Sequence, residues 1–151
     1  MFGTMTDPFN LERFIQAQDA VIDDVRHELR TGRKRTHWMW FVFPQLRALG
    51  HSATAQHYGI SSLTEACTYL AHPVLGERLM ECAELVLAVH GRSAHDILGS
   101  PDDAKLRSSM TLFAAAALDS AVFRAVLQKH YNGIPDSRTI ELLPNDLYQP
   151  P

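Results

Sequence analysis

The residues of this chain best suited to chemistry fall in two short segments, and the first is the aromatic segment Thr36–Gln45. It combines the titratable ring of His37 with the indoles of Trp38 and Trp40 and the amide of Gln45. Indoles stack on nucleobases and sugars, and a histidine can transfer a proton near neutral pH. We therefore expect Trp38, Trp40 and Gln45 to contact a ligand, with His37 as the candidate catalytic acid or base.

The second segment, Lys105–Thr111, places two cations and three hydroxyls within two turns of an expected helix. Serine and threonine are mediocre inside helices because their hydroxyls compete for backbone hydrogen bonds. Phosphate or carboxylate recognition would explain them, because cations supply charge and hydroxyls supply directed donors. Close packing of two helices, which favours small residues, is the alternative. The candidate ligand-binding residues here are Lys105, Arg107, Ser108, Ser109 and Thr111.

The aromatic segment also has a purely structural interpretation. Together with Phe41 and Phe43, the two tryptophans carry about 600–1,000 Å² of surface, whereas the largest exposed patch of a monomer is about 300–600 Å². Most of this surface must therefore be covered, either by the core or by a ligand. In the structural interpretation, Trp38 and Trp40 are core residues and His37 is a partly buried, hydrogen-bonded imidazole.

Three consecutive cations, Arg33, Lys34 and Arg35, precede the aromatic segment. Such a run could bind phosphate, but after a helix C-terminus it is more often a solvated face that complements the helix dipole. The formal net charge of -3 and the lack of a second basic cluster argue against nucleic acid as a partner.

The histidines form no recognisable metal motif. His51 and His57 are six residues apart and His90 and His95 are five apart, whereas two metal ligands on one helix face are usually about four apart. The sequence has no G-x-S-x-G motif, no glycine-rich phosphate loop and no pair of C-x-x-C motifs. We therefore expect neither a metal nor a cofactor.

The composition is that of a globular protein. With 151 residues and 46% hydrophobic content, the chain is expected to form one domain around a single core. Its two cysteines, Cys67 and Cys82, favour a reducing compartment over a disulfide framework. Residues 1–10 show no secretory signal, and no uncharged apolar run approaches the roughly 18–20 residues of a membrane span. We expect a cytoplasmic protein with no membrane partner.

Helical spacing of apolar residues and capping signals indicate the elements that position the two segments. A first long helix is expected from Asp7-Pro8 to Gly32, followed by a helical turn in the aromatic segment that ends at Pro44. Further helices are expected over 52–58, 62–71, 73–90, 93–98, 100–117, 120–131 and 135–143. The prediction is an all-α fold: a single compact domain over 7–143, with about eight helices and short loops, and a flexible tail over 144–151.

Several of these segments together resemble the family called domain of unknown function 1810. The similarity covers about residues 7–143 and is carried by residues 9–18, 32–46, 52–55, 69–76 and 108–113. It implies a mainly helical bacterial domain, and it supplies no established activity, catalytic residue or cofactor. Some members carry the label calpastatin-like, but nothing in this sequence resembles a disordered protease inhibitor.

Two functional hypotheses follow. In the first, the chain is a small-molecule-binding protein or an enzyme, and its site for a nucleotide-like or ADP-ribose-like anionic ligand lies between the aromatic segment and Lys105–Thr111. In the second, it is a non-catalytic helical interaction module, whose aromatic surface and basic run contact a protein partner or a second copy. The sequence leaves the number of subunits open.

Overall fold

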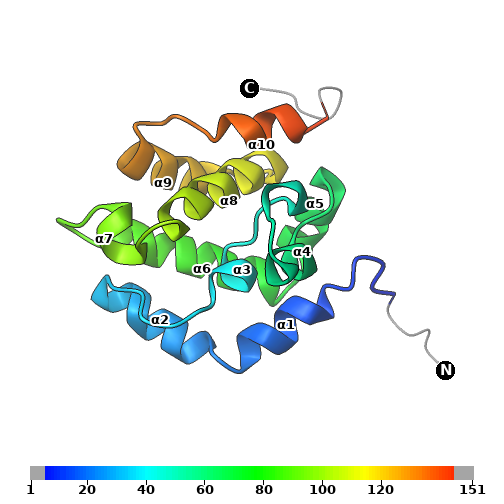
Figure 1. The fold of residues 1–151 in the computed structure, drawn as a ribbon, viewed down its shortest axis with the longest axis horizontal. Helices are drawn as coiled ribbons and strands as arrows, with labels where there is room; N and C mark the ends of the chain where they lie inside the picture. The colour runs from blue at the N-terminus through cyan, green and yellow to red at the C-terminus, as the bar shows by residue number, and fades with distance from the viewer. Residues whose placement is uncertain (1–5, 145–151) are drawn as a thin grey trace.

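The computed structural model describes residues 6–144, and over that range the chain forms ten α-helices and one short 3₁₀-helix (Figure 1). In chain order these are α1 (Glu12–Asp19), α2 (Ile22–Thr31), α3 (Met39–Val42), η1 (Arg47–Leu49), α4 (Ala53–Tyr58), α5 (Leu63–Ala71), α6 (Leu75–Ala88), α7 (Ala94–Leu98), α8 (Asp102–Ala116), α9 (Ala121–Tyr131) and α10 (Ser137–Leu142). Within residues 6–144, β structure is limited to one isolated parallel bridge between Leu46 and Ile60. The all-α prediction is confirmed, although the helices are shorter and more numerous than expected. The tail expected over 144–151 lies, after Pro144, outside the described residues.

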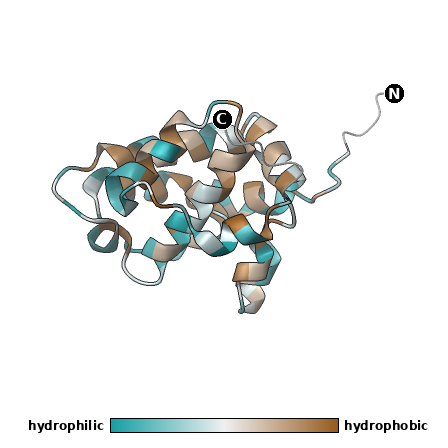
Figure 2. Ribbon diagram, turned by 90° about the horizontal axis from the view of Figure 1, so that it is seen from above, coloured by the Kyte–Doolittle hydropathy of each residue, from teal (hydrophilic) through white to brown (hydrophobic). Residues whose placement is uncertain are grey.

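The core is organised around α8, which packs against α5, α7, α9 and α10. A row of aromatic rings runs through it from Phe14 to Tyr69, Phe113 and Phe123, with successive ring centroids 5.1, 5.3 and 6.1 Å apart. Along the helices, hydrophobic and hydrophilic residues alternate (Figure 2), as expected when each helix buries one face. None of the helices described is long and apolar enough to cross a membrane.

The long helix expected between Asp7 and Gly32 is in fact two helices. The α1 helix ends at Asp19 and α2 begins at Ile22. A straight helix over residues 12–31 would be about 30 Å long, roughly the diameter of a small domain. The break lets α1 pack on α3 while α2 packs on α6. Apolar spacing did not reveal the break because both halves bury an apolar face.

A buried ion pair joins α1 to the start of α5. The Arg13 guanidinium lies 2.8 Å from the Glu65 carboxylate, and both side chains are almost completely buried. Arg13 also donates to the backbone carbonyls of His57 and Gly59, at 2.8 and 3.1 Å. The Glu65 carboxylate accepts from the backbone N–H and the hydroxyl of Ser61. These bonds hold the connection between α4 and α5 in place.

The close approach of α5 and α6 depends on Gly76. A Cβ atom at this position would overlap the backbone carbonyl of Leu70. Because backbone cannot move aside as a flexible side chain can, only glycine fits here.

Candidate functional site

The aromatic segment is held in place by the carboxylate of Glu28 on α2. Its Oε1 accepts hydrogen bonds from the backbone N–H groups of Arg35 and Thr36, at 2.6 and 2.9 Å. Oε1 also accepts from the indole Nε1 of Trp38 at 3.0 Å, and the Thr36 hydroxyl donates to Oε2 at 2.6 Å. Burial raises the pKa of Glu28, but these hydrogen bonds to the charged form outweigh it and lower the pKa to about 2. An ionised carboxylate therefore shapes the loop between α2 and α3.

This anchor places Trp38 in the core. Its side chain is 1% exposed and its ring packs on Phe43, with centroids 6.2 Å apart. The ammonium of Lys34 lies 5.1 Å from the Trp38 ring centroid. Trp38 is therefore the core residue of the structural interpretation and offers no free face on which a ligand could stack.

Trp40, Gln45 and Lys105 come together on one side of the molecule, as the ligand hypothesis requires. The Lys105 ammonium on α8 lies 5.3 Å from the Trp40 ring centroid, and all three residues line one small cavity. The cavity has a volume of only about 10 Å³, about the space that one water molecule needs. The two predicted segments thus meet, but they leave no room for a nucleotide between them.

His37 and the basic run lie apart from this cavity. His37 is exposed, lines none of the hollows described here, and has no hydrogen-bond partner within the described part of the chain. Lys34 forms an ion pair with Asp102 at 3.1 Å, whereas Arg33 and Arg35 are exposed. The three cations therefore do not form a single phosphate-binding site.

The hydroxyls of α8 are mostly used inside the helix bundle. The Ser108 hydroxyl donates to the carbonyl of Ala104 at 3.2 Å. The Thr111 hydroxyl donates to the carbonyl of Arg107 and accepts from the backbone N–H of Asp136, both at 2.8 Å. These contacts match the packing alternative for Ser108 and Thr111.

Of the two remaining residues of this segment, the Arg107 side chain has a hydrogen-bond partner and the Ser109 side chain has none among the described residues. Arg107 donates from Nε to the carbonyl of Ile134 at 2.9 Å, so it holds the α9–α10 connection. The hydroxyl of Ser109 is completely buried and has no hydrogen-bond partner among the described residues. Because a buried polar group without a partner is costly, Ser109 is the one hydroxyl of the segment that packing leaves unexplained.

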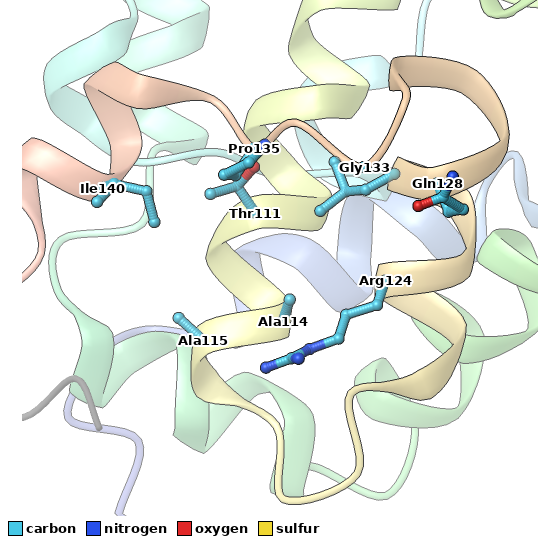
Figure 3. Close-up of a pocket in the computed structure, with 9 residues that line it drawn as sticks. Thr111, Ala114, Ala115, Arg124, Gln128, Gly133, Pro135 and Ile140 are labelled. Carbon is cyan, nitrogen blue, oxygen red and sulfur yellow. The ribbon is translucent and has the colours of Figure 1, made fainter. Parts of the chain in front are cut away.

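A larger pocket opens between α8, α9 and α10, and Thr111 is the predicted site residue that lines it (Figure 3). Its volume is about 350 Å³, within the range of about 300–1,000 Å³ typical of small-molecule sites. Aliphatic side chains make up much of its wall, among them Ala114, Leu127 and Ile140.

Arg124 and Gln128 supply the polar groups of this pocket. They lie one turn apart on α9, and the Arg124 side chain extends toward Ala114 and Ala115 of α8 (Figure 3). Within residues 6–144, Arg124 forms no ion pair. At the far end Gly133 has a φ of 74°, and a Cβ there would lie 2.7 Å from the Gln128 amide oxygen. A glycine at this turn therefore leaves space for that amide.

Sequence reasoning missed Arg124 and Gln128. Both are polar positions on the outer side of an amphipathic helix, a pattern that usually means solvent exposure. Their four-residue spacing places them on one helix face, but only the packing of α10 turns that face into a pocket wall.

Comparison with known proteins identifies similar proteins over most of the chain. The model of the family described as "Protein of unknown function (DUF1810)" matches residues 8–143. A similar solved structure is that of the conserved hypothetical protein Rv1873 from Mycobacterium tuberculosis. It is 59% identical, the match covers 91% of this chain and 98% of that chain, and the TM-score is 0.90. A search of curated proteins finds no match. These similarities confirm the fold and the family resemblance, and the names of these relatives state no ligand or reaction.

Proposed function

The chain belongs to the DUF1810 family of proteins of unknown function, and we propose that it binds a small anionic molecule with an apolar body in the pocket between α8, α9 and α10. The proposal rests on the position of the Arg124 side chain. Its guanidinium borders a largely aliphatic pocket and has no acidic partner in the described range. A guanidinium binds carboxylate and phosphate groups through paired hydrogen bonds.

The other lining residues define the rest of the ligand. Ala114, Leu127 and Ile140 provide apolar contacts, and the Gln128 amide can both donate and accept a hydrogen bond. The volume of about 350 Å³ lies at the lower end of the range for small-molecule sites. A ligand of mononucleotide size or smaller therefore fits better than ADP-ribose.

A second candidate location for an anionic ligand is the face of Trp40. The Lys105 side chain lies over this ring and is about a quarter exposed, with Asp102 at 3.7 Å. Movement of Lys105 away from the ring would uncover an aromatic surface for stacking next to the Gln45 amide. This location needs a rearrangement that the α8–α9–α10 pocket does not need, so we rank it second.

We propose binding and assign no reaction. His37, the predicted acid or base, lines neither the pocket nor the Trp40 cavity. We also place the protein in the cytoplasm, a proposal supported by its two free cysteines, Cys67 and Cys82.

A thermal-shift screen tests the proposal. Benzoate, phenyl phosphate, AMP and ADP-ribose would be compared with neutral benzamide and cationic benzylamine. A ligand at 100 times its Kd adds about 2.7 kcal/mol of stability, and we expect such shifts from the smaller anions only. Amide NMR of the hit should show shifts in α8, α9 and α10, and not around Trp40.

Arg124→Gln and Arg138→Gln form a matched pair for this screen. Both arginines are exposed, but only Arg124 lines the pocket. We expect Arg124→Gln to abolish the shift caused by anions and Arg138→Gln to keep it. Equal shifts from benzoate and benzamide, or an unchanged benzoate shift in Arg124→Gln, would refute the proposal.

A further inference from the structure

A second, more apolar groove lies on another part of the molecule, between α5, α6 and the α8–α9 connection. Its volume is about 500 Å³, and Leu70, Met80 and Phe123 contribute to its wall. Leu118, which is completely exposed, also lines the groove. Neither Arg124 nor any residue of the aromatic segment lines this groove.

The charged groups of this groove are all acidic. Glu77 and Asp119 line it, and no lysine, arginine or histidine of the described chain does so. Glu77 is exposed and forms no ion pair within residues 6–144. One oxygen of Asp119 accepts a hydrogen bond from the backbone N–H of Ala121 at 3.1 Å, which leaves the other oxygen available.

We propose that this groove binds an ammonium compound with an apolar body. The apolar part would pack on Leu70, Met80 and Phe123, and the cation would pair with the carboxylates of Glu77 and Asp119. Charge complementarity selects this occupant, because an anion would be repelled by the two carboxylates and a neutral molecule would gain no ion pair from them. The charge of this groove is therefore opposite to that of the Arg124 pocket. The ligand proposed here is independent of the one proposed there.

The reactivity of the Cys67 thiol can report whether the groove is occupied. Its thiol is exposed, lines the groove and lies 3.6 Å from the carbonyl oxygen of Ala116. The other cysteine of the chain, Cys82, is completely buried. Burial also raises the pKa of Cys82 to about 12, so it stays unreactive toward a mild alkylating reagent.

The experiment measures the alkylation rate of Cys67 by iodoacetamide, a small neutral reagent, in the presence of hexyltrimethylammonium, 1-hexanol or hexanoate. We expect saturable slowing by the ammonium compound, weaker slowing by the alcohol and the weakest by the acid. Lengthening the chain from butyl to octyl should tighten binding about fourfold per methylene. The NMR signal of the Met80 methyl group should shift at the same concentrations, which detects a ligand that leaves the thiol uncovered.

Variants of the two carboxylates distinguish charge-selective binding from nonspecific hydrophobic binding. In the double variant Glu77→Gln with Asp119→Asn, the ammonium compound should lose its advantage over hexanol, while the effect of hexanol stays. Glu84→Gln is the control, because Glu84 is exposed on α6 and does not line the groove.

Three outcomes would overturn the proposal. Equal slowing by hexanol and the ammonium compound in the wild type would show that the carboxylates select nothing. Neither slowing nor a Met80 shift would show that no such ligand binds. Slower alkylation at higher protein concentration, without any additive, would show that a second copy covers the groove.

Discussion

The indole nitrogen of Trp38 donates a hydrogen bond to the carboxylate of Glu28, with Nε1 and Oε1 3.0 Å apart. Glu28 comes ten residues earlier in the chain and lies on α2, so this bond fixes the aromatic segment to the preceding helix. The aromatic segment is thus held by a hydrogen bond to a buried carboxylate, and Trp38 has a structural role.

Replacing Glu28 should destabilise the protein. In Glu28→Gln the amide oxygen can accept from the three donors that now bond Oε1, but without the negative charge, and the Thr36 hydroxyl loses its acceptor Oε2. A hydrogen bond to a charged group contributes about 1.5–3 kcal/mol and a neutral one about 0.5–1.5 kcal/mol, so we expect a loss of about 2–4 kcal/mol in total. Urea unfolding followed by tryptophan fluorescence measures this. Glu84→Gln, an exposed control, should stay within about 0.5 kcal/mol of wild type.

The same carboxylate should make stability depend on pH. Its pKa is about 2 in the folded protein, against an ordinary value of 4.5. On acidification the unfolded chain therefore takes up the proton first, so the stabilisation is complete above about pH 4.5 and is lost as the pH falls toward 2. We expect the difference in unfolding free energy between wild type and Glu28→Gln to shrink over this interval. A difference that stays constant from about pH 6 to pH 3 would contradict the assignment.

Ser109 and Thr111 should respond in opposite ways to loss of the hydroxyl. Ser109→Ala removes a buried hydroxyl that has no partner in the described range, so stability should stay the same or rise. Thr111→Val leaves the backbone N–H of Asp136 without its acceptor and should cost about 1–3 kcal/mol. Urea midpoints of the two variants check this. A large loss of stability in Ser109→Ala would mean that its hydroxyl has a partner after all.

Gly76→Ala should destabilise the contact between α5 and α6. In an ordinary helix interior this change is stabilising by about 0.5–1 kcal/mol. Here the new methyl group would overlap the carbonyl of Leu70, and forcing extra volume into a packed interface costs about 1–3 kcal/mol. We expect a lower thermal midpoint by calorimetry. A raised midpoint would show that the two helices separate at little cost.

The helical character of the protein and many of its helix starts could be predicted from local sequence signals. Ser52, Ser62 and Asp136 were expected as starts, and each side chain accepts a hydrogen bond from a backbone N–H three residues later. Such signals can be read from the sequence because the donor and the acceptor are close together along the chain. The ligand hypothesis also placed Trp40 near Lys105, and the Lys105 ammonium lies 5.3 Å from the Trp40 ring centroid.

Which of these residues face solvent, and where the pockets lie, depends on the packing of helices that are distant in the sequence. In the folded protein Trp38 is buried against Glu28, little space is left between Trp40 and Lys105, and residues of α8, α9 and α10 together line a pocket that includes Arg124. The physical reason is distance along the chain. Burial and cavity shape depend on how side chains from separate helices fill a shared volume, and local spacing carries no information about that volume.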